Sequence, residues 1–255
     1  ENIPFYGFAA MCVDHSDVQS LCSQIEERKI IKYGLNPNAD ISAENIKIDS
    51  FGSVFDVVLR EPMYFPKIIN QVKIKMPGKH NIQNALAAFL IGIELGINHE
   101  TIIKGLELFS GVERRFSIIG SINDITIVDD YAHHPVEIKA VLNASKYVSN
   151  NKIIAVVQPH RFSRLQSLFN DFCTCFNEAD VVIVLDVYPA GEEPIVGFDR
   201  DRLAEGIRSH GHKNVISLED EKELAQTIAS ISKPKDIVIC VGAGSISGWA
   251  NNLPS

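Results

Sequence analysis

The sequence lacks the features that would place it in a membrane, outside the cell or on nucleic acid. None of its apolar runs reaches the ~18 residues that a membrane-spanning helix requires, and we expect no secretory signal peptide. Its five cysteines form no C-x-x-C pair, so we expect reduced, mostly buried thiols in a reducing, cytoplasmic compartment. The formal net charge of -8 disfavours nucleic acid and anionic membranes as partners, since both require clustered cations.

Two nucleotide-binding signatures are missing or incomplete. The phosphate-loop pattern G-x-x-x-x-G-K-[ST] occurs nowhere, because His80 follows Gly78-Lys79 and Lys73 stands where the first glycine belongs. Residues 242–248 resemble the dinucleotide pattern G-x-G-x-x-G only superficially, since the third glycine comes one position late. We interpret these glycines as a tight turn between a strand and a helix.

The composition is typical of a globular protein. Hydrophobic residues make up 45% of the 255 positions and charged residues 22%, enough for one large core or two modest ones. The pattern changes at Ser110 and Gly111, which predicts two domains, residues 1–110 and 111–255. The chain begins with Glu1 in mid-pattern rather than with Met, so we expect a further segment upstream.

The first domain is predicted to combine strands and helices. Apolar residues alternate between positions 40 and 76, which predicts antiparallel hairpins. Apolar residues then recur at helical spacing from Ile82 to Ile93, and Gly96 is expected to end that helix. The other expected elements are a strand at 9–13, a helix at 17–28 with Ser16 as N-cap, and a helix at 99–109.

The second domain is predicted to be an α/β fold. Near-continuous Val/Ile strands alternate with amphipathic helices, which is typical of a mostly parallel sheet covered on both faces. The expected strands are 125–129, 153–158, 181–187, 215–218 and 237–241, and the expected helices are 135–148, 165–179, 200–209, 221–231 and 246–252.

Polar side chains directly follow three of these strands, at 129–134, 158–161 and 186–193. Ligands of such sheets bind beyond the carboxyl ends of the strands. We therefore expect the three segments to follow adjacent strands and to form one crevice rim.

The segment 129–137 gives the sharpest functional signal. Five titratable or phenolic groups within six residues are difficult to explain by packing, although Asp130 can cap a helix and Pro135 suits a first helical turn. A metal site is the alternative interpretation, since Asp and His both bind metals.

Two arginine pairs also suggest anion binding. Arg161 and Arg164 are three residues apart and share a face if the turn is helical, which would make a carboxylate or phosphate clamp. An exposed basic helix start is disfavoured there, because cations at a helix N-terminus oppose the dipole. Arg114 and Arg115 lie at the domain boundary, where they are either solvated or directed into the interdomain cleft, and the planar fork of arginine suits phosphate.

The start of the apolar helix has two interpretations. In the first, Asn81 caps the helix and Asn84 is a solvated surface residue. In the second, the positive end of the helix and the two amides recognise a purine edge.

The chain resembles the Mur ligases in five segments, which stand in the order and spacing of that family: GKHNIQNALAA, GVERRF, DDYAHHPVE, QPHRFSR and DVYPAGEEPI. The resemblance covers nearly the whole chain, is most specific from 78 to 193, and favours the branch of the family that adds L-alanine. It implies that residues 1–110 are the end of a central ATPase domain with a mixed sheet, and that 111–255 are a Rossmann-like carboxy-terminal domain. The UDP-binding domain, the phosphate loop and the magnesium ligands would all precede Glu1.

The resemblance also implies the chemistry. The enzyme would be an ADP-forming ligase of peptidoglycan precursor synthesis that uses ATP, Mg²⁺, UDP-N-acetylmuramate and L-alanine, through an acyl phosphate. By similarity, the cofactor-binding residues would be His80, Asn81 and Asn84 at the adenine, Arg115 at the ATP phosphates and Asp130 at the ribose. Alanine and the acyl phosphate would be positioned by Tyr131, His133, Arg161 and Arg164 with support from His160, and the catalytic residues would be Arg115, His133, Arg161 and Arg164.

Two other classes of function stay open on the sequence alone. A metal-dependent hydrolase would use Asp129, Asp130, His133 and His160. A non-catalytic nucleotide-binding module would bind ATP without chemistry on a second substrate.

Overall fold

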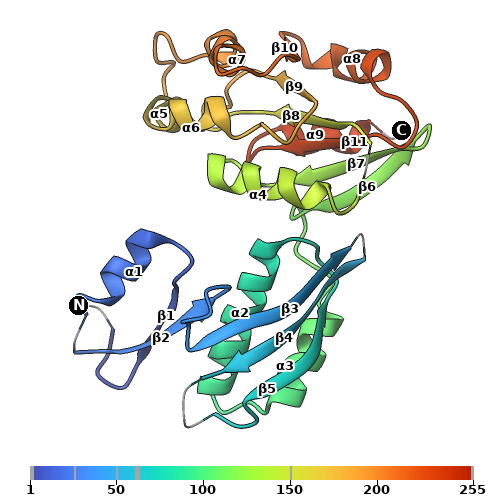
Figure 1. Ribbon diagram of the computed structural model, residues 1–255. Helices are drawn as coiled ribbons and strands as arrows, with labels where there is room; N and C mark the ends of the chain where they lie inside the picture. The colour runs from blue at the N-terminus through green and yellow to red at the C-terminus, as the bar shows by residue number, and fades with distance from the viewer. Residues whose placement is uncertain (1–2, 26, 50, 61–63, 150, 254–255) are drawn as a thin grey trace. The chain divides into compact units, whose positions relative to one another are not determined.

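The computed structural model describes residues 3–25, 27–49, 51–60, 64–149 and 151–253. The chain divides into two compact units, Glu1–Ser110 and Gly111–Ser255, each with a sheet and a hydrophobic core of its own (Figure 1).

The first unit is built on a five-stranded mixed sheet in the order β1-β2-β3-β4-β5 (Figure 1). The first three strands run parallel, whereas β3, β4 and β5 form the predicted antiparallel hairpins. The strands are β1 (Phe8–Cys12), β2 (Lys29–Gly34), β3 (Ile41–Asp49), β4 (Gly52–Leu59) and β5 (Ile68–Ile74). The helices are α1 (Ser16–Cys22), α2 (Lys79–Glu94) and α3 (His99–Leu108).

Helix α2 supplies most of the helical side of this core. Leu86, Phe89 and Leu90 are fully buried, as the helical spacing predicts. Gly96 follows the end of the helix with φ +79°, a left-handed conformation that glycine adopts without strain. The N-cap is Gly78, and the side chain of Asn81 donates to the Pro77 carbonyl at 2.9 Å. The interpretation of Asn81 as the cap is therefore wrong.

The region after β1 also differs from the prediction. Helix α1 begins after His15, not Ser16, and it ends at Cys22 instead of continuing to residue 28. The unpredicted strand β2 follows, and its Ile31 is buried in parallel register with Ala10. Pairing with β1 overrides a local pattern that also fits a helix.

The second unit has a six-stranded sheet in the order β10-β9-β8-β11-β7-β6 (Figure 1). It is mostly parallel, as predicted, and only the unpredicted edge strand β6 is antiparallel. The strands are β6 (Ser117–Ile122), β7 (Ile125–Asp130), β8 (Ile153–Val157), β9 (Val181–Val184), β10 (Val215–Ser217) and β11 (Ile237–Val241).

Helices cover both faces of this sheet. The helices are α4 (Pro135–Ser145), α5 (Phe162–Ser167), α6 (Phe169–Thr174), α7 (Arg200–Ser209), α8 (Leu224–Ile231) and α9 (Ile246–Asn252). Residues of α4 to α7 pack into one core and residues of α8 and α9 into the other. Within the described residues, no helix is long and apolar enough to cross a membrane.

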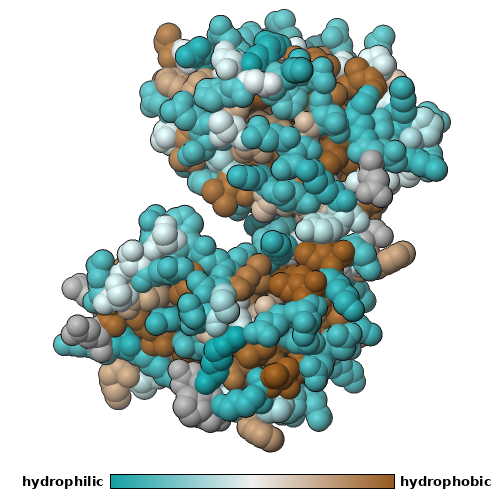
Figure 2. All heavy atoms as spheres, viewed as in Figure 1, coloured by the Kyte–Doolittle hydropathy of each residue, from teal (hydrophilic) through white to brown (hydrophobic). Residues whose placement is uncertain are grey.

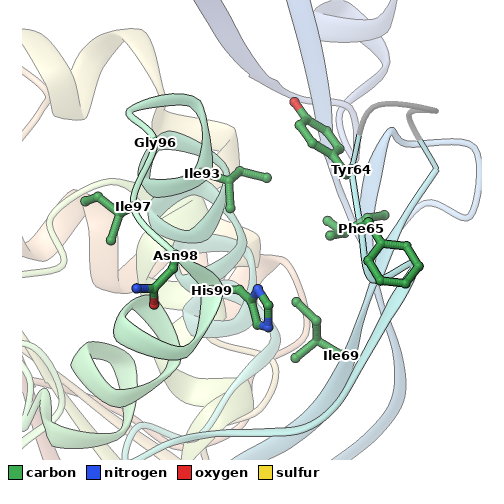
Figure 3. A pocket seen from close by; sticks show the side chains of 9 residues that line it. Tyr64, Phe65, Ile69, Ile93, Gly96, Ile97, Asn98 and His99 are labelled. Atoms are coloured by element: carbon green, nitrogen blue, oxygen red, sulfur yellow. The ribbon is translucent and has the colours of Figure 1, made fainter.

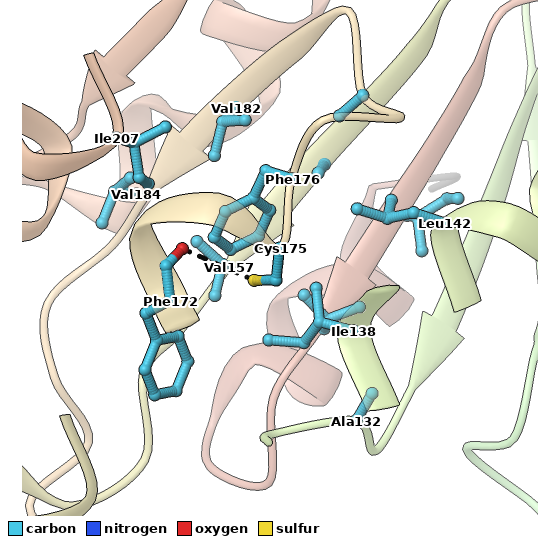
Figure 4. Close-up of a cluster of buried hydrophobic side chains, with 14 of the residues drawn as sticks. Ala132, Ile138, Leu142, Val157, Phe172, Cys175, Phe176, Val182, Val184 and Ile207 are labelled. Atoms are coloured by element: carbon cyan, nitrogen blue, oxygen red, sulfur yellow. Dashed lines mark hydrogen bonds between the residues drawn. The ribbon is translucent and has the colours of Figure 1, made fainter. Parts of the chain in front are cut away.

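The core beneath α4 to α7 shows how tightly this side is packed. Ile138 and Leu142 of α4 approach Phe172 and Phe176, and Cys175 donates its thiol to the Phe172 carbonyl at 3.5 Å (Figure 4). Burial raises the pKa of the Cys175 thiol. All five cysteines are free and only Cys12 is not buried, which confirms the prediction for the thiols.

Two predicted helices of the second unit are interrupted. The expected helix 165–179 is two short helices, α5 and α6, which meet at Leu168. The expected helix 221–231 begins as a 3-10 turn, η1 (Glu221–Glu223), and becomes α-helical at Leu224.

Candidate functional site

The carboxyl edge of the second sheet brings the predicted segments together across an intervening strand. The expectation that all three follow adjacent strands is wrong for the first segment, because β11 lies between β7 and β8, whereas β8 and β9 are adjacent as expected. Strand β11 runs into Gly242 and Gly244, and a Cβ at Gly244 would lie only 2.5 Å from the Gln158 side chain. Glycine at this position leaves the space to the Gln158 side chain, and His133 and His160, which follow β7 and β8, lie with their ring centroids 5.8 Å apart.

Four ring side chains form a continuous row along this edge, the ring row: Tyr131, His133, His160 and Tyr188. The Tyr131 and His133 rings meet edge to face at 5.2 Å, and the two imidazole centroids are 5.8 Å apart. His160 then stacks on Tyr188 at 5.4 Å with an interplanar angle of 17°. The structure thus brings Tyr131, His133 and His160 together, and it adds Tyr188, which the sequence did not single out.

The surroundings of His133 fix its tautomer. Its Nδ1 lies 2.9 Å from the Tyr131 carbonyl oxygen and 3.7 Å from Oε2 of Glu137. Both oxygens only accept hydrogen bonds, so Nδ1 carries a proton and, in the neutral ring, Nε2 carries the lone pair. His134 caps α4 in a capping box with Glu137, and this box holds the segment in place.

His160 has the opposite arrangement. Its Nδ1 lies 3.3 Å from Nη1 of Arg164, which also donates to the His160 carbonyl at 3.0 Å. A guanidinium can only donate, so Nδ1 of His160 is the acceptor and Nε2 carries the proton. Burial, followed by the positive charge of Arg164, lowers the pKa of His160, which keeps the ring neutral at neutral pH.

The two imidazoles therefore offer complementary Nε2 atoms, an acceptor on His133 and a donor on His160. Within the described residues, neither Nε2 has a hydrogen-bond partner. Neutral imidazoles of opposite tautomer can serve a single reaction as proton acceptor and proton donor.

Arg161 has a strained backbone. It precedes α5 with φ 74° and ψ 132°, a region that non-glycine residues rarely occupy, and its N–H donates to the Tyr188 carbonyl at 2.9 Å. Its side chain is exposed, and its guanidinium has no ion pair in the described part of the chain. Strain of this kind concentrates at functional sites.

In the Arg114–Arg115 pair, Arg114 is bound to groups of the protein and Arg115 is exposed. Arg114 donates from Nη2 to the Gly242 carbonyl at 2.7 Å, and its Nε lies 3.5 Å from Oδ2 of Asp129. Its Cζ also lies 4.8 Å from the centre of the Tyr131 ring. Arg115 is exposed, and its Cζ lies 5.9 Å from the same centre. Only Arg115 is left available to a ligand.

The two carboxylates that end β7 are each only 2% exposed. Asp129 accepts a hydrogen bond from the Ser247 hydroxyl and lies beside the Arg114 guanidinium. Asp130 accepts the backbone N–H groups of Phe116 and Ala132, both at 2.7 Å. Burial raises the pKa of Asp130, and these two hydrogen bonds oppose the rise. In this arrangement Asp130 fixes the backbone next to Arg115. A contact between the buried Asp130 carboxylate and a ribose would require the segments around Phe116 and Ala132 to open, and the contact stays a prediction.

The metal-site alternative is not supported by this geometry. Asp129 and Asp130 turn into the protein, whereas His133 and His160 line its surface edge. In the part of the chain that the structure describes, no group of three or more His, Cys, Asp or Glu side chains can hold a metal ion.

In the first unit, the predicted adenine ligands lie in the first turns of α2. His80 and Asn81 are half-buried and Asn84 is exposed. Gln83, on the same turns, donates to Asp14 at 2.5 Å, which ties the end of β1 to the start of α2. The adenine contact of these residues stays a prediction.

A hollow of about 240 Å³ lies elsewhere in the first unit, between the loop before β5 and the turn from α2 to α3 (Figure 3). Tyr64, Phe65 and Ile69 face Ile93 and the His99 ring across it (Figure 3). Hydrophobic atoms also reach the surface over the part of this unit that carries α2 and β3 to β5 (Figure 2). The lining has no carboxylate, Lys or Arg, so it offers no permanently charged group for phosphate, and its titratable side chains are those of Tyr64 and His99.

Sequence reasoning missed four residues that shape the site: Asp129 in its structural role, Tyr188, Glu192 and Ser247. Glu192 accepts from the backbone N–H of Ser163 at 3.0 Å and from its hydroxyl at 2.6 Å. Tyr188 and Glu192 belong to the segment DVYPAGEEPI, so the resemblance pointed to the right loop but not to the residues. No local signal linked Ser247 to Asp129, because they are 118 positions apart.

The chain is a mixed α/β unit followed by a mostly parallel α/β unit, with arginines and histidines at the carboxyl edge where such sheets bind ligands. The sequence matches the "Mur ligase middle domain" over residues 1–92 and the "Mur ligase, glutamate ligase domain" over residues 114–244. The second match alone spans more than half of the chain, which therefore belongs to the Mur ligase family.

Individual relatives are more specific than the two family matches. The chain is 53% identical over 255 residues to the UDP-N-acetylmuramate–L-alanine ligase of Rhodopseudomonas palustris (strain HaA2), covering 100% of this chain and 54% of that protein. The ligase of the same name from Rhodospirillum rubrum is 52% identical over 254 residues. The crystal structure of UDP-N-acetylmuramate-alanine ligase from Thermotoga maritima matches with a TM-score of 0.70 and 29% identity, over 88% of this chain and 46% of that chain. The chain thus spans about half the length of the relatives it matches.

Proposed function

We propose that this chain is the carboxy-terminal part of an ADP-forming UDP-N-acetylmuramate–L-alanine ligase of peptidoglycan precursor synthesis. Residues 1–110 would be the end of its central ATPase domain, and 111–255 its carboxy-terminal domain. The names and identities of the relatives support the reaction, and the complementary histidines of the ring row are the observation in the molecule that carries it.

The reaction has two steps that need different groups. The γ-phosphoryl group of ATP passes to the carboxylate of the sugar acid, which gives an acyl phosphate and ADP. The amine of L-alanine then attacks the acyl carbon, the bond from that carbon to the phosphate oxygen breaks, and phosphate leaves as the amide forms. Cations must stabilise the phosphoryl charge, a base must take a proton from the amine, and a donor must stabilise the oxyanion.

The second unit offers one group for each of these needs. The lone pair on Nε2 of His133 accepts the proton of the alanine amine. The N–H on Nε2 of His160, whose ring centroid lies 5.8 Å from that of His133, donates to the oxyanion that forms at the acyl carbon. Arg161 supplies the exposed guanidinium for the alanine carboxylate or the acyl phosphate, while Arg164 holds His160 and completes the positive edge. Tyr131 closes the row beside the arginine pair.

ATP is proposed to bind with its adenine at His80, Asn81 and Asn84, its ribose at Asp130 and its phosphates at Arg115. Mg²⁺ belongs to the same proposal, and among the described residues no group of three or more His, Cys, Asp or Glu side chains could hold it. The substrates are small molecules, and a cytoplasmic location is proposed with them. Without a phosphate loop, the 255-residue chain should release no phosphate from ATP when alanine is added. Measurable release would contradict this.

The full-length protein tests the activity directly. We expect L-alanine-dependent phosphate release from ATP in the presence of UDP-N-acetylmuramate. ATP binding without any such release would instead favour a non-catalytic nucleotide-binding module.

The neighbouring arginines provide the matched pair of variants. Arg115→Ala should reduce kcat/KM for ATP by roughly 10²-fold or more, as the loss of a transition-state donor does. Arg114→Ala should instead act mainly on stability, because it leaves buried Asp129 without its cation. An unchanged kcat/KM in Arg115→Ala would remove Arg115 from the site.

A further inference from the structure

We propose that Tyr188 is a positioning residue, whose backbone holds the strained turn at Arg161 and whose ring holds His160. The proposal rests on the proposed function only for its kinetic consequences, since the geometry and the titration of His160 can be measured without activity.

The backbone of Tyr188 continues the pairing of β8 and β9 beyond both strands. Its N–H donates to the Pro159 carbonyl at 2.8 Å, and its carbonyl accepts the N–H of Arg161 at 2.9 Å. The two hydrogen bonds flank His160, which forms a parallel bridge with Tyr188. They hold Arg161 at φ 74°, a conformation that persists only where the surroundings enforce it.

The ring of Tyr188 is fixed from two sides. It stacks on the His160 imidazole at 5.4 Å. It also packs on the backbone of Gly244, where an added Cβ would lie 2.5 Å from Cγ and 2.7 Å from Cδ2 of the ring. No side chain larger than glycine fits at position 244 unless the Tyr188 ring or the Gln158 side chain moves.

The ring and the hydroxyl of Tyr188 have separable roles. The side chain is 37% exposed, and within the described residues its hydroxyl has no hydrogen-bond partner. The packing therefore depends on the ring alone, and Tyr188→Phe preserves it.

Packing of the Tyr188 ring affects the pKa of His160 as well as its position. Burial is the largest cause that lowers the pKa of His160, the guanidinium charges of Arg164 and Arg161 add to it, and the carboxylate of Glu192 opposes them. Removing the Tyr188 ring lets water reach the imidazole and leaves these charges in place. The pKa of His160 should then rise towards its ordinary value.

A histidine titration by NMR in the 255-residue chain tests the positioning itself, with the His160 signal assigned from its loss in His160→Gln. We expect Tyr188→Leu to raise the pKa of His160 by roughly half a unit or more, and Tyr188→Phe to leave it as in the parent. An unchanged pKa in Tyr188→Leu, or an equal rise in Tyr188→Phe, overturns the role of the ring.

Two glycines supply a second route that leaves Tyr188 in place. Gly244→Ala pushes a methyl group towards the ring and should shift the His160 titration in the same direction as Tyr188→Leu. Gly248→Ala is the matched control, because it lies four residues further on with nothing within 4 Å of the added carbon. Equal titration curves for the two glycine variants would also overturn the proposal.

Kinetics of the full-length enzyme then separate this inference from the proposed function. Tyr188→Leu and Gly244→Ala should lower kcat or raise KM for L-alanine by about tenfold, with KM for ATP unchanged, whereas Gly248→Ala should match the parent. A parallel loss for all substrates would indicate a merely structural role. If the parent has no ligase activity, the proposed function fails, and the NMR result still decides whether Tyr188 positions His160.

Discussion

The ends of β7 and β8 carry the same side chain in opposite surroundings. At the end of β7, His133 faces a carbonyl and a carboxylate, and its Nδ1 must donate. At the end of β8, His160 faces a guanidinium, and its Nδ1 must accept. The comparison shows that the histidine alone does not define the chemistry of either segment. The neighbouring groups make one imidazole an acceptor at the site and the other a donor.

The backbones of the two ends differ as well. The end of β7 enters α4 through a capping box and Pro135, all in ordinary conformations. The end of β8 enters α5 through Arg161 in the left-handed region, with no side-chain cap. We infer that the first end is built for stability and the second for directing its arginine, at a cost in conformational energy.

Removing the imidazole of His133, the proposed proton acceptor, should have the largest effect on kcat. His133→Ala in the full-length enzyme should reduce kcat by roughly 10²- to 10⁴-fold, the range expected for loss of a general base. His134→Ala is the neighbouring control: it removes the cap of α4, costs about 1 kcal/mol of stability, and should leave kcat nearly unchanged. The measurement is alanine-dependent phosphate release at saturating substrates, and similar kcat values for the two variants would refute the role of His133.

Replacing Arg161, the residue with the strained backbone, should raise stability and lower activity. Arg161→Gly relieves a left-handed backbone, so the free energy of unfolding should rise by roughly 1 kcal/mol, while ligase activity falls with the loss of the guanidinium. On the β7 side, Ala132→Gly should lower stability by about 1 kcal/mol, because Ala132 is fully buried. Urea denaturation of the 255-residue chain measures both changes, and a loss of stability in Arg161→Gly would contradict the strain.

Much of the second unit could be predicted because its signals are local. Runs such as Ile237–Val241 are apolar throughout and are fully buried in the sheet. The residues of the β7 and β8 ends were also predicted, since a strand followed by His and Arg is visible in the sequence. The same holds for the burial of Ile82 and Leu86, which follows from helical spacing alone.

What could not be predicted depends on contacts between distant segments. The insertion of β11 between β7 and β8 is set by topology, and β2 lies between β1 and β3 and pairs with both. The position of the Tyr188 ring depends on Gly244, which is 56 positions away and which the sequence pattern indicates only as an ordinary turn glycine. The inward turn of Arg114 depends likewise on Asp129 and Gly242.

A smaller effect should come from the carboxylate beside His133. Glu137→Gln keeps the capping box, because Gln also serves at that position, so stability should change by less than about 0.5 kcal/mol. The tautomer of His133 should stay the same, since the Tyr131 carbonyl lies closer to Nδ1, at 2.9 Å against 3.7 Å for Glu137. A changed tautomer would show that the carboxylate, and not the carbonyl, sets the acceptor side.

The most direct test of the complementary pair is the imidazole ¹⁵N spectrum of the uniformly labelled chain near neutral pH, with His133 and His160 assigned by single substitution. The ¹⁵N shifts and long-range couplings report which ring nitrogen carries the proton. We predict that Nδ1 of His133 carries a proton and that His160 is neutral and protonated on Nε2. The same tautomer on both rings, or a positive charge on His160 at that pH, would contradict the account.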